Sequence, residues 1–250
     1  MKKIVLLISV LLCVTGVKAQ VDSTFSSGKG RAEVTVPTAT GLSRKDFNRN
    51  RLHHSFALAT PVAAVGLALM PADKPISNRV QKGMPEFHSG VDDYLRFVPL
   101  AAQLSMSLGG VEGRSGSRWQ MVATDAMAGA MMVAMTGGLK YTINRTRPNG
   151  EEAGFPSGHT ATVFMGATLL SHEFGHKSLW FPVAGYSVAT ATAALRILNN
   201  KHYASDVLVG AAVGILSAEL AYWATDAIFK DRKIFKRKRA RQHCEVLKNY

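Results

Sequence analysis

Six apolar segments separated by short polar loops fill most of the chain from residue 52 onward, and they restrict its fold more than any other feature. They are Leu52–Met70, Tyr94–Gly110, Trp119–Leu139, Ser157–Phe174, Leu179–Leu195 and Ala204–Ile228. Rich in Ala, Leu, Met, Val and Gly, they show little of the alternation of a strand, which predicts helices. Their lengths of 17 to 25 residues match the thickness of a bilayer core. The sequence therefore predicts an all-α, membrane-embedded helical bundle with five or six hydrophobic helices.

The alternative is a soluble all-helical protein with buried apolar helices. A mean hydropathy of +0.05 is low for six spans, and Gln103, Asp125 and Glu219 lie inside the segments. Small residues in runs such as AGAMMVAMTGG nevertheless suit helices that pack closely in lipid. No internal repeat and no second domain are visible in the sequence, so we expect a single bundle over residues 52–229.

The two ends of the chain differ from this bundle. Residues 1–19 have a basic start and an apolar run, and Val17 and Ala19 then fit a cleavage site before Gln20, which predicts a secretory signal peptide. Residues 20–51 form a polar lead-in. Residues 230–250 form a basic tail, which contributes much of the net charge of +13. The two cysteines lie near opposite ends of the chain, which excludes a disulfide framework and a cysteine zinc site.

The orientation follows from the alternation of spans. The basic tail marks its own side as cytoplasmic, so the loops that carry Lys140 and His202 face the other side of a bacterial inner membrane, the periplasm. One conflict remains open. A cleaved signal peptide puts residue 20 outside, whereas six spans with a cytoplasmic tail require Leu52 to start inside. Either the first segment, broken by Pro61, does not span, or the signal peptide is not cleaved.

Fixed positive charge follows the third segment, at Lys140 and Arg147. Pro148 disfavours helical geometry at Arg147, so this side chain can turn into a pocket. An arginine fork grips phosphate oxygens in pairs and a lysine adds a point charge. The alternative is that both cations merely extend to water from a helix end.

A Pro-Ser-Gly-His turn opens the fourth segment. Free N–H groups at a helix start bind anions, and Gly158 lets a ligand approach the backbone closely. Ser157 can add a hydroxyl donor, and His159 can carry a proton to a leaving group. The alternative is an ordinary serine cap beside a surface histidine.

The third cluster joins Arg196, His202 and Asp206 around the start of the sixth segment. His202 and Asp206 are four residues apart, so on a helix they share a face and the carboxylate can hold the imidazole. The other ring nitrogen would then act as nucleophile or base. A purely structural hydrogen bond is the alternative for this pair.

Together the stretches KYTINRTRP, PSGH and LRILNNKHYASD resemble the signature of the type 2 phosphatidic acid phosphatase superfamily, which also contains class A acid phosphatases and vanadium haloperoxidases. Leu195 stands where the family usually has Ser. The resemblance implies that His202 attacks phosphorus, that Asp206 orients it, and that His159 protonates the leaving oxygen and later activates water. It also implies a set of groups that hold the phosphoryl oxygens, without metal or other cofactor: Lys140, Arg147, Ser157, Gly158 and Arg196.

Apolar segments favour the membrane lipid phosphatase branch of this superfamily. The expected partners are the membrane and a phosphorylated lipid, either a phosphomonoester or a pyrophosphate, and no nucleic acid. Lipid A, phosphatidylglycerophosphate, undecaprenyl pyrophosphate and phosphatidic acid are candidates. A soluble periplasmic acid phosphatase is the alternative within this class, and a non-catalytic protein that binds anionic lipid is the alternative outside it. The short, apolar chain argues against a haloperoxidase.

A competing motif, His172-Glu173-x-x-His176, has the pattern of zinc proteases. The chain lacks any Asp-Gly dipeptide, which related intramembrane proteases use as a further ligand motif. Gly175 weakens the helix that the motif needs. A zinc protease is therefore a distant alternative.

Overall fold

The computed structural model describes residues 44–85, 87–115 and 117–248, and for residues 44–55, 58 and 230–248 it describes the backbone alone. The described residues form helices joined by loops, with no β-strand among them, so the predicted all-α fold is confirmed. The predicted signal peptide, residues 1–19, lies outside the described residues, as does most of the polar lead-in. In chain order the elements are α2 (Arg44–Leu69), the 3₁₀ helix η1 (Met70–Ala72), α3 (Asp73–Gly83), α4 (Val91–Leu95), α5 (Val98–Leu108), α6 (Arg118–Ile143), α7 (Gly158–Phe174), α8 (Trp180–Leu198) and α9 (Ala204–Lys248).

Three helices are long and apolar enough to cross a membrane by length and composition: α6, α8 and the Ala204–Phe229 part of α9. In these helices the prediction of a membrane-embedded bundle is confirmed. The helices α7 and α5 have 17 and 11 residues, fewer than the roughly 20 that usually span a bilayer core. The predicted second segment is divided into α4 and α5 because Pro99 lies in the first turn of α5, where its missing N–H costs no hydrogen bond.

The expectation that Pro61 breaks the first segment is wrong. Helix α2 runs without interruption from Arg44 to Leu69 with Pro61 inside it. It packs along α9, and this tertiary contact offsets the hydrogen bond that a proline in the helix interior removes. The helix also begins within the segment predicted as a polar lead-in.

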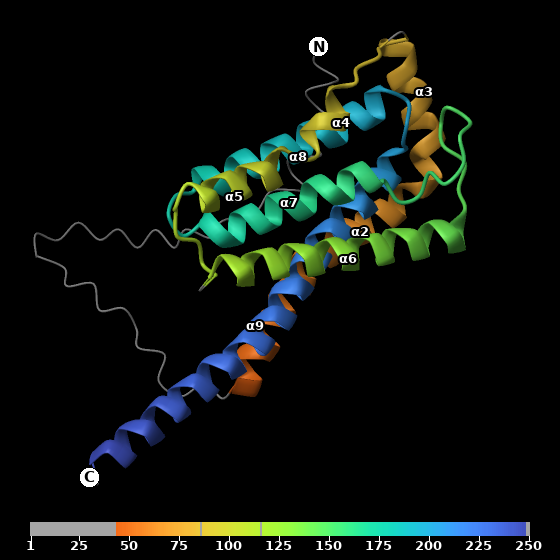
Figure 1. Ribbon diagram of the computed structural model, residues 1–250. Helices are drawn as coiled ribbons and strands as arrows, with labels where there is room; N and C mark the ends of the chain where they lie inside the picture. The colour runs from red at the N-terminus through yellow and green to blue at the C-terminus, as the bar shows by residue number, and fades with distance from the viewer. Residues whose placement is uncertain (1–43, 86, 116, 249–250) are drawn as a thin grey trace, which may run out of the picture.

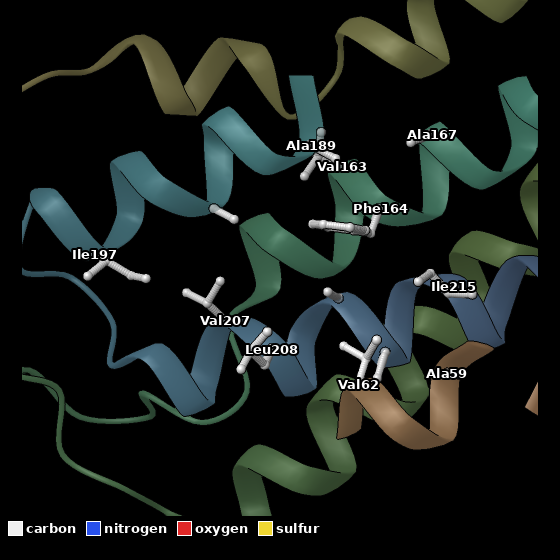
Figure 2. Close-up of a cluster of buried hydrophobic side chains, with 13 residues drawn as sticks. Ala59, Val62, Val163, Phe164, Ala167, Ala189, Ile197, Val207, Leu208 and Ile215 are labelled. Carbon is white, nitrogen blue, oxygen red and sulfur yellow. The ribbon is translucent and has the colours of Figure 1, made fainter. Parts of the chain in front are cut away.

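The long helix α9 organises the bundle, because α2, α6 and α7 all pack against it (Figure 1). Small side chains let these helices approach, and Figure 2 shows Ala59 of α2 near Ile215 of α9 within one cluster of buried apolar residues. The C-terminal part of α9 continues beyond the bundle, so the predicted basic tail from residue 230 is helical to Lys248.

The start of α7 lies unusually close to α9. A Cβ atom at Gly210 would lie only 2.5 Å from the carbonyl oxygen of Ser157, so only glycine fits there. The main-chain N–H of Ser157 donates to the carbonyl oxygen of Asp206 over 2.9 Å. The Pro-Ser-Gly-His turn is therefore fixed beside the first turn of α9. We call this region, residues 140–159 and 196–206, the motif end of the bundle.

At the opposite end of the bundle, the loop after α5 covers the last turn of α7. The N–H of Arg114 donates to the carbonyl oxygen of Glu173 over 3.0 Å, and its guanidinium pairs with Asp226 of α9 at 2.9 Å. The helix α7 thus runs from the motif end to this opposite end, and each end carries its own set of polar side chains.

Candidate active site

The loop between α6 and α7 folds back on itself and thereby presents the arginines. The N–H of Arg147 donates to the carbonyl oxygen of Glu151 over 2.8 Å, and the N–H of Gly154 donates to that of Arg145 over 2.7 Å. Lys140, in the last turn of α6, donates from Nζ to the carbonyl oxygen of Ala153. These contacts bring Lys140 and Arg147 to one loop, as the spacing of the motif predicts.

Gly154 joins this loop to His202. A Cβ atom at residue 154 would lie 2.9 Å from Cγ of Arg147 and 3.0 Å from the carbonyl oxygen of Arg145, so the loop closes only around glycine. The carbonyl oxygen of Gly154 lies 2.8 Å from Nδ1 of His202. Nothing in the motif spacing singles out Gly154, because its role depends on a close approach between two backbones.

His202 lies in the loop before α9 and its side chain is only 2% exposed. With Nδ1 donating to Gly154, the lone pair of Nε2 is left free. Burial lowers the pKa of His202 from 6.5; Asp206 opposes this shift and Arg196 adds to it, so the imidazole is neutral at pH 7. A neutral imidazole with a free Nε2 has the form that a nucleophile requires.

Asp206 contacts His202 less closely than its spacing predicts. The distance from Oδ2 of Asp206 to Nδ1 of His202 is 3.7 Å, longer than a hydrogen bond. The helix begins at Ala204, so His202 precedes it and the helical spacing of four residues does not apply. Asp206 instead accepts from the N–H of Tyr203 at 2.9 Å and from Arg145 at 3.1 Å.

Arg145 pairs with Asp206 and with Asp73, and the motifs identified neither Arg145 nor Asp73 as part of the site. Arg145 pairs with Asp73 at 2.8 Å, donates to Ser205 over 2.8 Å, and stacks on Tyr203 with 4.5 Å from its guanidinium carbon to the ring centre. Asp73, the first residue of α3, also accepts from the N–H of Ser205 at 3.1 Å. Asp73 therefore caps the start of α9 and orders the turn that carries Asp206. The only signal in the sequence was an additional arginine two residues before Arg147.

The Pro-Ser-Gly-His turn forms the start of α7, as predicted. Ser157 is the N-cap, and its buried hydroxyl accepts from the N–H and the hydroxyl of Thr160 at 3.5 and 3.0 Å. Its own O–H remains available to donate. Among the described residues, and apart from its chain neighbours and the backbone of its own helix, no atom lies within 4 Å of the position that a Cβ at Gly158 would occupy. The backbone is therefore open to a ligand at the first residue of the helix.

Two neighbouring carboxylates of α4 contact Arg196 and His159. Asp92, fully buried, accepts from Arg196 at 2.7 Å and from Asn199 at 3.1 Å. Asp93 lies 2.6 Å from Nε2 of His159 and 3.6 Å from Arg196. The motifs did not identify α4, although its carboxylates contact both His159 and Arg196.

The two arginines of the motifs keep unused hydrogen-bond donors. Within the described part of the chain, Nε of Arg147 and Nε of Arg196 are buried and have no hydrogen-bond partner. An unsatisfied buried donor costs about 1–3 kcal/mol, and more for a charged group. A tetrahedral anion between the two guanidiniums would supply the missing acceptors. The arrangement can thus bind a phosphoryl group next to a neutral histidine.

The side chains of the zinc-protease motif do not converge. His172 lies 2.6 Å from Glu219, whereas Glu173 accepts from Ser115 and Tyr222. The helix α7 ends at Phe174, so His176 does not share a helix face with His172. Among the described residues, no group of three His, Cys, Asp or Glu side chains is placed to hold a metal ion.

A family model and a curated protein both match this chain. Residues 121–230, which include all three motifs, match the family model of the PAP2 superfamily. A lipid A 1-phosphatase of Porphyromonas gingivalis is 45% identical over 196 residues, which cover 78% of this chain and 43% of that protein. The chain thus spans less than half the length of this relative.

Two solved structures also resemble this fold in part. One is a crystal structure of Aquifex aeolicus LpxE, with a TM-score of 0.45 and 21% identity, covering 58% of this chain and 92% of that one. The other is a PAP2-type phosphatidylglycerolphosphate phosphatase from Bacillus subtilis, with a TM-score of 0.40 and 18% identity, covering 71% of this chain and 97% of that one. Residues 121–230, which carry all three motifs at one end of the bundle, thus form a region of the PAP2 superfamily.

Proposed function

We propose that this protein is a membrane phosphatase that hydrolyses a lipid phosphomonoester or pyrophosphate through a phosphohistidine on His202, without a metal ion. The observation that carries the proposal is the pair of unused buried donors on Arg147 and Arg196, beside a neutral His202. Phosphoryl transfer depends mainly on alignment and on charge stabilisation, which these groups supply.

The residues at the motif end have distinct roles in this mechanism. Phosphoryl oxygens lie between Arg147 and Arg196, with Lys140, Ser157 and the N–H of Gly158 as further donors. Nε2 of His202 bonds to phosphorus while the bond to the lipid oxygen breaks, and that oxygen takes a proton from His159. In the second step, His159 takes a proton from water, whose oxygen bonds to phosphorus as the bond to His202 breaks. The products are inorganic phosphate and either the lipid alcohol, from a phosphomonoester, or the lipid monophosphate, from a pyrophosphate.

A phosphorylated lipid A is the first substrate to test, because the 45% identical relative is named a lipid A 1-phosphatase. Helices long and apolar enough to span favour a membrane enzyme over a soluble acid phosphatase. The basic tail favours a cytoplasmic C-terminus, which would orient the motif end toward the periplasm.

The test is phosphate release from a panel of lipid phosphates in detergent with EDTA: phosphorylated lipid A, phosphatidylglycerophosphate, undecaprenyl pyrophosphate and phosphatidic acid. We expect the wild type to release phosphate and the His202→Ala variant to lose at least about 1,000-fold in rate, as enzymes do when a nucleophile is removed. His176→Ala, which changes an exposed residue outside the motif end, is the matched control and should keep full activity. A wild type that releases nothing, or an equally active His202→Ala, would overturn the proposal.

A further inference from the structure

The short helix α4 carries two adjacent carboxylates that differ in their surroundings. Asp92 is 0% exposed and binds Arg196 and Asn199. Asp93 has a side chain that is 47% exposed and lies 2.6 Å from Nε2 of His159. Neighbours in sequence thus contact two different residues of the phosphatase motifs.

Asp93 also lies 3.6 Å from Arg196, but closer contacts of other residues dock α4. Asn199 donates from Nδ2 to the carbonyl oxygen of Ser89 over 2.8 Å, and its Oδ1 accepts from the N–H of Ser89 over 2.9 Å. The buried pair between Asp92 and Arg196 adds a second attachment. A half-exposed carboxylate is not needed to hold this helix, so its short contact with His159 calls for another role.

A carboxylate on one nitrogen of a histidine fixes the tautomer and the direction of the ring. With Asp93 accepting from Nε2–H, the other nitrogen, Nδ1, is left to exchange protons with a substrate. The hydrogen bond from His159 lowers the pKa of Asp93, so Asp93 carries its negative charge at neutral pH. Burial and the charge of Arg196 lower the pKa of His159 to about 4, and Asp93 opposes this shift. The charge of Asp93 thus favours the imidazolium form that a proton donor must reach, and a bound phosphate dianion would add to it.

We propose that Asp93 is the positioning carboxylate of His159, so that each of the two reacting histidines has an acceptor that fixes its tautomer. This inference rests on the proposed phosphatase function. As the P–O bond to the lipid breaks, the imidazolium of His159 gives its Nδ1 proton to the leaving oxygen and becomes neutral. In the second step Nδ1 takes a proton from the attacking water, and Asp93 stabilises the imidazolium that forms again.

The experiment compares two substrates that carry the same phosphoryl group but differ in the leaving group. Phosphatidic acid releases an alkoxide that needs a proton, whereas p-nitrophenyl phosphate releases a stable phenolate. We expect Asp93→Asn to lower kcat for phosphatidic acid by roughly 10- to 100-fold, part of what general acid catalysis contributes. For p-nitrophenyl phosphate, the rate constant of the burst phase, which reports phosphorylation of the enzyme in the first turnover, should change by less than about threefold. That step needs no acid.

Asp92→Asn is the matched control, because Asp92 holds Arg196, which would bind the phosphoryl oxygens of both substrates. This variant should weaken turnover of both substrates to the same extent and raise KM. An equal loss on both substrates in Asp93→Asn would reduce Asp93 to a structural role and overturn the inference. A gain in activity would also overturn it, because Asp93 would then obstruct His159. A wild type inactive on both substrates and on every lipid phosphate of the panel above would instead contradict the proposed function itself.

Discussion

The two ends of α7 both bury charged groups, yet they satisfy them to different degrees. At the opposite end, the fully buried carboxylate of Glu173 accepts from the N–H of Ser115 at 2.9 Å, from its hydroxyl at 2.5 Å and from the hydroxyl of Tyr222 at 2.8 Å. At the motif end, Arg147 and Arg196 each keep a buried Nε with no partner among the described residues. Both ends therefore bury charge, and our proposal of a phosphate site rests on the unused donors of the motif end and not on burial.

The largest expected difference between the two ends is in the effect of removing one arginine. Arg147→Ala should lower kcat/KM by about 100- to 1,000-fold, the usual consequence of losing one donor to a developing oxyanion. Arg114→Ala, at the opposite end, removes a partly exposed pair with Asp226 and should leave kcat/KM within about twofold of wild type. Phosphate release by the two variants measures the difference. Equal losses would mean that the two ends do not differ in function.

A smaller loss of activity is expected from a change at Asp73, which pairs with the same arginine as Asp206. Asp73→Asn removes the charge that pairs with Arg145 and caps the start of α9, and it should lower the free energy of unfolding by about 2 kcal/mol. The activity should fall roughly tenfold through kcat, because the turn that carries Asp206 loosens, with KM little changed. Thermal unfolding in detergent and steady-state kinetics give the two values. An unchanged kcat would show that Arg145 and Asp73 serve stability alone.

At the opposite end, loss of stability without loss of rate is the expected result. Glu173→Gln places an amide N–H₂ where Ser115 donates, so it should cost about 1–2 kcal/mol of unfolding free energy. The rate per folded molecule should equal that of the wild type, since Glu173 lies at the far end of α7. Activity normalised to the folded fraction is the measurement. A selective fall in kcat would contradict a purely structural role for this end.

The sequence predicted the helices and the motifs more completely than the contacts between them. Apolar runs marked α6, α8 and α9, and the Pro-Ser-Gly-His turn marked the start of α7 correctly, because these features are local. Asp73 and Asp92 could not be found this way, since their arginine partners lie 72 and 104 residues away along the chain. Which carboxylate meets which arginine is decided when helices pack, and periodicity carries no such information.

The contact between His202 and Asp206 shows the same limit on a smaller scale. Four residues of spacing predicted a shared helix face, but the chain enters α9 only at Ala204. The carbonyl oxygen of Gly154 takes the place that the carboxylate was expected to fill. A backbone acceptor from another loop leaves no trace in the pattern of side chains.

The smallest expected effect is on pH dependence. Burial already lowers the pKa of His202, while the charge of Asp206 opposes that shift. Asp206→Asn should therefore lower the pKa of His202 further and move the acid limb of kcat/KM to lower pH. Comparison of variant and wild type on the same substrate cancels the ionisation of the substrate. A shift of the acid limb to higher pH would contradict the proximity of Asp206 to His202.

Direct detection of phosphate on His202 tests the central claim, that the motif end transfers a phosphoryl group through this residue. In His159→Ala, p-nitrophenyl phosphate should still phosphorylate the enzyme, because its leaving group needs no acid, while the slower attack of water lets the intermediate accumulate. Mass spectrometry after rapid quenching at alkaline pH, where phosphohistidine survives, is then expected to find phosphate on His202 and none in His159→Ala/His202→Ala. Turnover without phosphate on His202, or phosphate on another residue such as Ser157, would contradict the account.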